Sequence, residues 1–184
     1  IHGGELTQGA IDDALRHSIT KLSHLHFVST PEYASRVVQL GEEPWRVTLS
    51  GAPALDNLKS IRLRSLAQLK KKYTWYFRGK PLLVTFHPVT LEYERVGWQM
   101  KQLLSALSLA KRPVIFTLPN VDTKHSAVIE AIRSFIRRNR RAYLVENLGT
   151  QDYFSLMAAS AAMVGNSSSG LIEAASFRLP VVNV

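Results

Sequence analysis

Leu82-Leu83-Val84 is the first of five short apolar runs that follow one another along the second half of the chain. The other four are Val114-Ile115-Phe116, Tyr143-Leu144-Val145, Met163-Val164 and Val181-Val182. The stretches between them have helical spacing, over residues 91–110, 126–139, 151–161 and 170–177. Strands that alternate with helices of this length indicate βαβ units, in which helices cover both faces of a parallel sheet. Residues 81–184 are therefore predicted to form a doubly wound α/β domain.

The first part of the chain shows a shorter version of the same alternation. A helix is expected from Ile11 to Leu22, because apolar residues there recur in steps of four, four and three. The expected elements that follow are a strand over Leu25–Val28, a helix from Pro31 towards Leu40 and a strand over Val47–Leu49. We interpret residues 1–58 as the C-terminal part of a first Rossmann-like domain. Residues 59–80, which are basic and poor in glycine, form the predicted boundary region.

The composition excludes several classes of protein. With 184 residues, 46% hydrophobic and 20% charged, the chain is neither collagen-like, disordered nor a coiled coil. No apolar run approaches the roughly 18 to 20 residues that cross a bilayer. The absence of cysteine excludes disulfides, thiolate metal sites and a cysteine nucleophile. We expect a soluble protein of the cytoplasm, because Ile1 opens no signal-peptide pattern.

The formal charge of +9 comes from 23 Lys and Arg residues against 14 Asp and Glu residues. Much of it lies in a first basic stretch over residues 59–80 and a second basic stretch over residues 133–141. Their basic residues are Lys59, Arg62, Arg64, Lys70, Lys71, Lys72, Arg78 and Lys80, and Arg133, Arg137, Arg138, Arg140 and Arg141. Such stretches can mark a nucleic-acid-binding module, which is the alternative from another class. Here they flank apolar positions at helical spacing, so solvated helix faces are favoured.

Two of the predicted strands end in polar side chains. In open parallel sheets, ligands bind beyond the carboxyl ends of the strands. His87 follows the strand at Leu82 and precedes Pro88, so it can donate to an anion or move a proton near neutral pH. A structural role for a lone histidine is about as frequent. The segment Leu118-Pro119-Asn120-Val121-Asp122 follows the next strand, and its residue types favour a simple turn.

The segment Gly165-Asn166-Ser167-Ser168-Ser169-Gly170, called here the serine turn, carries the strongest signal. It precedes a predicted helix, so backbone N–H groups and hydroxyls gather where anions bind. Glycine at both ends allows a ligand to approach the backbone closely. The segment matches neither the Walker A nor the GxGxxG pattern. We interpret it as an anion site rather than an ordinary helix cap, with Glu173 placed to accept from ribose hydroxyls.

The start of the chain is a third candidate. His2-Gly3-Gly4-Glu5 contains two glycines, which permit a tight turn. In the helix that follows, Asp12 and Arg16 stand one turn apart, so the guanidinium would pair with the carboxylate and hold it ionised. The alternative is a routine ion pair on a helix surface.

Taken together, these segments resemble the UDP-N-acetylglucosamine 2-epimerase family. The resemblance is greatest to its hydrolysing branch, which makes N-acetylmannosamine for sialic and related nonulosonic acids. The similar stretches are His2–Glu5, GAIDDALRHSITKLSH at 9–24, His87–Thr90, Pro119–Asp122 and Gly165–Gly170 with Glu173. They occur in the family's order and at comparable spacing over essentially the whole chain.

The resemblance implies a GT-B-like fold of two Rossmann-like domains, with the active site in the cleft between them. Residues 1–58 would be the C-terminal part of the first, and residues 81–184 would be the second, nucleotide-binding domain. It also implies that UDP is eliminated across C1 and C2 of the sugar. Water then adds to the glycal intermediate and N-acetylmannosamine leaves. Neither a metal nor another cofactor is implied. The implied partner is a UDP-sugar, without nucleic acid or membrane, and the full-length protein is expected to be a homodimer.

By position, the resemblance assigns roles to individual residues. The catalytic residues would be Asp12, Arg16 and His87, with His87 beside the nucleotide phosphates. The substrate- or UDP-binding residues would be Asn120, Leu148, Ser167, Ser168, Gly170 and Glu173, of which Leu148 meets the uracil.

The chain departs from the family at His2, where some members carry a glutamate. A carboxylate role does not transfer there, and Glu5 is a candidate substitute. The alternatives are a non-hydrolysing epimerase, a hydrolysing epimerase of UDP-diacetylbacillosamine, and a glycosyltransferase of similar fold. Because the chain opens at Ile1 and ends on an apolar run, we expect a fragment that lacks the start of the first domain and the end of the second, and that cannot turn over alone.

Overall fold

The computed structural model describes residues 1–6, 12–87, 95–118 and 126–184, and the side chains of 12, 59, 126 and 127 lie outside that description. The described residues form two compact units, one up to Lys59 and one from Ser60 onward. In the part of the chain that the structure describes, no helix is long and apolar enough to cross a membrane.

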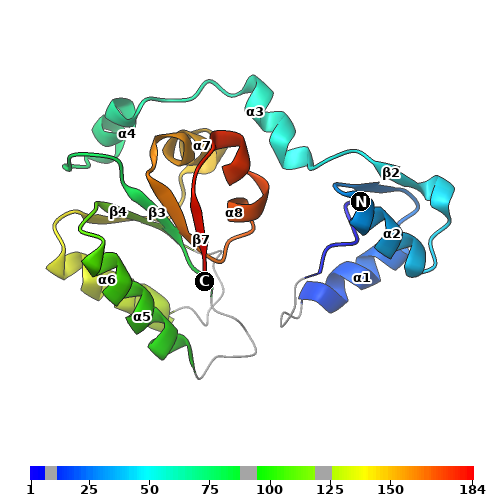
Figure 1. Cartoon of the computed structure of the whole chain (residues 1–184), viewed down its shortest axis with the longest axis horizontal. Coiled ribbons are helices and arrows are strands. Elements are labelled where there is room, and N and C mark those ends of the chain that lie inside the picture. Colours follow the sequence, from blue (N-terminus) through cyan, green and yellow to red (C-terminus); the bar gives the residue numbers. More distant parts are fainter. Residues whose placement is uncertain (7–11, 88–94, 119–125) are drawn as a thin grey trace. The chain divides into compact units, whose positions relative to one another are not determined.

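The first unit contains a two-stranded parallel sheet with helices beside it (Figure 1). Strand β1 pairs with β2 in the register His26↔Val47. Helix α2 begins after Thr30, whose side chain accepts a hydrogen bond from the N–H of Tyr33, which satisfies one of the unpaired amides of the first turn. The elements are α1 (Asp12–Leu22), β1 (His26–Val28), α2 (Pro31–Gln39), η1 (Pro44–Arg46), β2 (Val47–Leu49), η2 (Pro53–Asp56) and α3 (Asn57–Ser60).

The second unit is built on a parallel sheet of five strands in the order β5-β4-β3-β6-β7. These strands are β3 (Leu82–Thr85), β4 (Val114–Thr117), β5 (Ala142–Val145), β6 (Ala162–Gly165) and β7 (Val181–Asn183). The central strand β3 has all four residues buried, as expected for a strand covered on both faces. The predicted α/β class with a parallel sheet is therefore confirmed.

Helices cover the two faces of this sheet (Figure 1). Helices α5 (Val96–Leu109) and α6 (Ser126–Arg138) pack on one face, where Val84 and Phe116 meet Met100 and Phe135 in a buried cluster. Helix α7 (Gly149–Ala159) lies on the other face and packs against α4 (Leu66–Tyr73). Leu156 of α7 is fully buried. This core holds the carboxyl ends of the strands in fixed positions.

Two details differ from the sequence expectations. The segment predicted as a boundary region over 59–80 contains α4, and from Ser60 onward it is part of the second unit. The helix predicted over 170–177 is two short pieces, α8 (Ser169–Ile172) and η4 (Ala174–Phe177). The chain turns there because Arg178 follows in a left-handed conformation, with φ of 50°, before β7 begins.

Candidate functional site

The order of the sheet reverses at β3. From this strand the chain adds β4 and β5 on one side, and β6 and β7 on the other. Crevices form where the strand order of a parallel sheet reverses, and ligands bind there beyond the carboxyl ends. His87 follows β3 and the serine turn follows β6, so the fold brings two of the predicted sites to neighbouring strand ends.

Asn166 ties these two strand ends together. Its side chain accepts from the N–H of His87 at 2.7 Å and donates to the C=O of His87 at 2.7 Å. Its own N–H donates to the carbonyl oxygen of Thr85 at 3.2 Å. Gly165 permits this approach, because it has φ of 143° and a Cβ there would collide with the same Thr85 oxygen. The position of residue 87 relative to the serine turn is thus fixed by backbone and amide contacts.

The serine turn presents hydroxyls beside backbone amides. The Oγ atoms of Ser167 and Ser169 are 3.1 Å apart, and the N–H of Ser169 donates to Ser167 Oγ at 3.4 Å. Ser168 precedes α8 without a capping bond from its side chain and is exposed. Since α8 is a single turn, its dipole is weaker than that of the helix expected from the sequence. Anion binding here would rest mainly on local amides and hydroxyls.

Gly170 and Glu173 complete this segment. A Cβ at Gly170 would lie 3.0 Å from Cγ1 of Val181, so the glycine lets α8 pack against β7. Glu173 is half-buried, and burial raises the pKa of its carboxyl above the usual range. Its Oε2 is buried and has no hydrogen-bond partner among the described residues. A buried acceptor without a partner is costly, and the hydroxyls of a ligand would supply the missing donors.

Tyr153, on α7, is a site residue that sequence reasoning missed. Burial raises the pKa of its hydroxyl, against the opposing effect of hydrogen bonds with Ser169, Thr85 and Ser167. The Oγ1 of Thr85 is in turn 2.6 Å from that of Thr117 at the end of β4. The hydroxyls of Tyr153, Thr85 and Thr117 are therefore connected with those of the serine turn. No local sequence signal marks Tyr153, because polar and apolar residues are mixed around it in α7.

Of the two remaining predicted binding residues, the structure describes Leu148 but not Asn120. Leu148 precedes α7 after β5, so β4 and β3 stand between it and the serine turn. Gly149 follows with φ of 64°, and its N–H donates to Asn147 Oδ1 at 2.8 Å. Asn120 lies outside the described residues, as do Pro88–Thr90.

The first unit gathers His2, Glu5 and Arg16. Arg16 donates to Oε2 of Glu5. Asp12 opens α1, but its side chain is outside the described part of the chain. The His2 ring contacts both Ser29 and Glu5. Its Nε2 lies 3.0 Å from Ser29 Oγ, and its Nδ1 lies 4.0 Å from Glu5 Oε1.

Gly4 makes this cluster compact. It has φ of 83°, and a Cβ there would collide with the carbonyl oxygen of Tyr33. Arg36 also donates to the carbonyl of Gly4. Among the described residues, no group of three histidine, aspartate or glutamate side chains is arranged to hold a metal ion.

A family model described as UDP-N-acetylglucosamine 2-epimerase matches residues 1–184. The chain belongs to this family. The resemblance stated from the sequence motifs is therefore confirmed, and it holds from the His2–Glu5 cluster through the serine turn.

Several curated members of the epimerase family are similar to this chain. The GDP/UDP-N,N'-diacetylbacillosamine 2-epimerase (hydrolyzing) of Campylobacter jejuni is 41% identical over 99% of this chain and 48% of its own length. Polysialic acid biosynthesis protein P7 of Escherichia coli is 38% identical over 100% of this chain and 47% of its own length. The chain thus spans about half the length of the curated relatives it matches.

Solved epimerase structures share the fold. The MnaA–UDP complex of S. aureus has a TM-score of 0.73 with 22% identity, covering 93% of this chain and 44% of that one. The Neisseria meningitidis UDP-GlcNAc 2-epimerase bound to UDP-GlcNAc has a TM-score of 0.72 with 18% identity, covering 100% of this chain and 51% of that one. The predicted GT-B-like class of the epimerases is confirmed at the level of the fold.

Proposed function

We propose that the protein carrying this chain is a hydrolysing UDP-N-acetylglucosamine 2-epimerase. It would eliminate UDP from UDP-N-acetylglucosamine and hydrate the glycal intermediate to release N-acetylmannosamine. The observation that carries the proposal is the serine turn, with the unpartnered oxygen of Glu173, at the reversal point of the sheet in a chain of this family. The hydrolysing relatives support the choice of branch.

In this proposal, the second unit holds the nucleotide. The amides and hydroxyls of Ser167 and Ser168, with the close approach allowed by Gly170, bind the diphosphate, and His87 offsets the charge on departing UDP. Glu173 accepts from the ribose hydroxyls. Leu148 offers backbone groups to the uracil, three strand spacings or about 14 Å from the serine turn.

Asp12 is proposed as the catalytic carboxylate of the elimination. The C2 proton of the sugar leaves to a base, the C1–O bond to the diphosphate breaks, and a C1=C2 double bond forms. Water then adds its hydroxyl to C1 while a proton returns to the opposite face of C2. Arg16 would order the cluster of His2, Glu5 and Arg16 through its bond to Glu5, and Asn120 would contact the substrate. General acid–base chemistry and neutralised leaving-group charge are what this reaction needs.

A second candidate substrate is UDP-N,N'-diacetylbacillosamine. The observation that favours it is the 41% identity to the Campylobacter jejuni epimerase, together with 34% identity to the UDP-N,N'-diacetylbacillosamine 2-epimerase (hydrolyzing) of Legionella pneumophila. The mechanism would be the same, since the two substrates share the UDP group and the acidic C2 proton. The whole protein is proposed to act in the cytoplasm as a homodimer, without metal or nicotinamide, nucleic acid or membrane.

The test is incubation of the whole protein with each UDP-sugar in deuterated water, followed by proton NMR. We expect UDP release and free N-acetylmannosamine deuterated at C2. Asp12→Asn should reduce the rate at least 100-fold, whereas Asp13→Asn, its neighbour on α1, should stay within threefold. Turnover of the diacetamido sugar alone would change the substrate and keep the mechanism. Release of UDP-N-acetylmannosamine would favour the non-hydrolysing reaction, and absence of UDP binding would refute the proposal.

A further inference from the structure

A basic pocket of about 220 Å³ lies at the amino-terminal edge of the second unit's sheet. It forms where α5 and α6 end and where β4 and β5 begin, at Val114 and Ala142. This is the opposite edge from the serine turn. Five cationic side chains line it, and no acidic residue is among its described lining; the cations are Lys111, Arg112, Arg138, Arg140 and Arg141.

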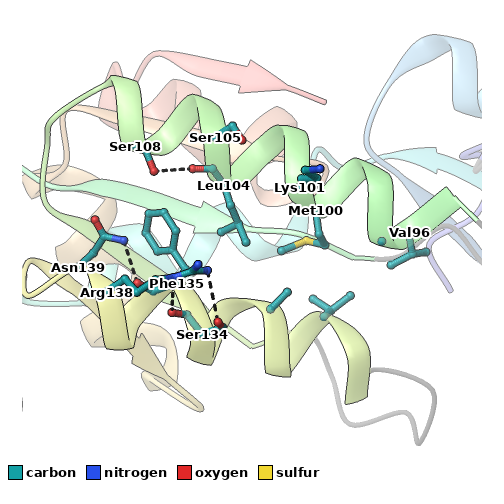
Figure 2. Close-up of a pocket in the computed structure, with 13 residues that line it drawn as sticks. Val96, Met100, Lys101, Leu104, Ser105, Ser108, Ser134, Phe135, Arg138 and Asn139 are labelled. Atoms are coloured by element: carbon teal, nitrogen blue, oxygen red, sulfur yellow. Dashed lines mark hydrogen bonds between the residues drawn. The ribbon is translucent and has the colours of Figure 1, made fainter.

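The pocket continues a groove of about 590 Å³ between α5 and α6 (Figure 2). Met100, Leu104 and Phe135 lie along this groove, and Arg138 and Asn139 stand at its end. Asn139 donates to the carbonyl of Phe135 at 2.8 Å, so the mouth shared by the two hollows is fixed by the end of α6. The cations therefore converge on a concave surface rather than on a flat stripe.

The charges of this pocket are not neutralised within the described part of the chain. Arg138 donates to the carbonyl and hydroxyl of Ser134, at 3.2 and 3.3 Å, which leaves its positive charge uncompensated. None of the five cations forms an ion pair with a described residue. The acid on α6, Glu130, is bound to Arg137 at 2.7 Å, and neither lines the pocket.

The ordinary explanation for such cations is the helix dipole. The C-terminus of a helix carries about −0.5 elementary charge, so the ends of α5 and α6 together supply about −1. Against five cations, that leaves an excess of about four positive charges around one small pocket. Mutual repulsion of this size is reduced most by a bound anion with several charges.

The backbone conformation of Lys111 is a second observation that favours a bound anion. This residue follows the end of α5 with φ of 51°, a left-handed conformation that glycine or asparagine adopts more easily. A lysine is therefore strained there relative to a position in the right-handed region. The strain is understandable if the side chain supplies a charge that glycine would lack.

We propose that this pocket binds a compact oligophosphate, such as the di- or triphosphate group of a small molecule. The volume of 220 Å³ is room for about seven water molecules, which suits an oligophosphate group and excludes a nucleic-acid duplex from the pocket itself. Guanidinium groups match phosphate oxygens in pairs, which explains the preponderance of arginine. The site is separate from the proposed UDP site, and the proposal does not depend on it.

The test is calorimetric titration of the whole protein with inorganic triphosphate, in the presence of saturating UDP. The variant Arg140→Gln/Arg141→Gln should lower the affinity at least tenfold. The control Arg133→Gln/Arg137→Gln removes the same charge from α6 outside the pocket, and its affinity should stay within about twofold of wild type. Lys111→Gly should also weaken binding several-fold, and because it relieves the strained φ it should fold at least as well as wild type.

Three results would overturn the proposal. Equal losses in the two double variants would mean that net charge alone attracts the anion. Displacement of triphosphate by UDP would place it in the nucleotide site. Tighter binding of a DNA duplex, weakened equally by the control variant, would mean an extended nucleic-acid surface.

Discussion

The two basic stretches look alike in the sequence and differ in the structure. In the first, Arg64 Nε lies 2.7 Å from Asp152 Oδ1 and Lys72 Nζ lies 2.5 Å from Asp152 Oδ2. In the second, the pair of Arg137 and Glu130 is exposed, and the cations of the basic pocket have no acidic partner among the described residues. Ion pairs of Arg64 and Lys72 with Asp152 hold the first stretch to the rest of the second unit, whereas the basic side chains of the second stretch are exposed.

The difference shows that a run of basic residues in a sequence does not identify the acidic residue that pairs with it. Asp152 is 2% exposed and lies 88 positions from Arg64 in the chain. The hydroxyl of Tyr73 also donates to it, at 2.7 Å. Burial raises the pKa of the Asp152 carboxyl, but the hydrogen bonds from Lys72, Tyr73 and Arg64 outweigh it and hold the pKa below its usual value. This junction attaches α4 to α7.

Among the variants that test this comparison, Asp152→Ala should have the largest effect. It removes the common acceptor of three donors from a buried position, so we expect a loss of about 3 kcal/mol in the free energy of unfolding. The loss is at the low end for a buried pair because Arg64 and Lys72 are 39% and 51% exposed and can be hydrated. Urea unfolding followed by the fluorescence of Trp75, which stacks on Tyr73 at 4.8 Å, measures it locally.

The matched control for this variant is Glu130→Ala. It breaks a pair whose side chains are 64% and 63% exposed, and it should leave the urea midpoint of unfolding nearly unchanged. Similar losses in both variants would mean that the two stretches do not differ as described.

A smaller effect is expected from acid. The pKa of Asp152 is lowered from its ordinary value of 3.8, so its ion pairs stabilise the fold fully above that pH. This stability is lost as the pH falls through the folded pKa. The difference in unfolding free energy between wild type and Asp152→Asn should therefore shrink below about pH 4. Glu173 titrates in both proteins, so it cancels in the difference. A constant difference down to pH 2 would contradict the role of ionised Asp152.

The smallest effects distinguish the two stretches by sign. Lys72→Gln should lower the thermal unfolding midpoint, by less than Asp152→Ala does, because it removes one donor to a buried carboxylate. Arg140→Gln should change stability by a few tenths of a kcal/mol, and at low salt the change should be favourable because it relieves repulsion. Thermal unfolding of both variants at two salt concentrations checks this. A destabilised Arg140→Gln would reveal a structural partner.

Periodicity predicted the elements well, because helix and strand spacing are local properties. The five apolar runs became β3 to β7, and His87 and the serine turn follow strands as expected. That these two strands, β3 and β6, are neighbours is shown only by the structure. The helix expected over 170–177 is two short pieces, α8 and η4, because apolar spacing does not distinguish one α-helix from an α-turn followed by a 3-10 turn.

Contacts between distant residues could not be predicted in the same way. Arg16 bonds to Glu5, which lies outside its own helix and 11 positions away, and helical spacing does not reveal such a partner. Tyr153 reaches the hydroxyls of the serine turn because α7 packs on the sheet, and no local pattern specifies that packing. Family resemblance supplied roles for Asp12, Leu148 and Asn120, which the residues alone did not.

Asn166 also makes the proposed anion site depend on a single amide. Replacing that amide by a carboxylate would put an oxygen that repels the carbonyl of His87 in place of the N–H group that donates to it, and would add a negative charge beside the serine turn. The buried apolar cluster of the sheet does not include Asn166, so nucleotide binding would be lost while the fold is kept.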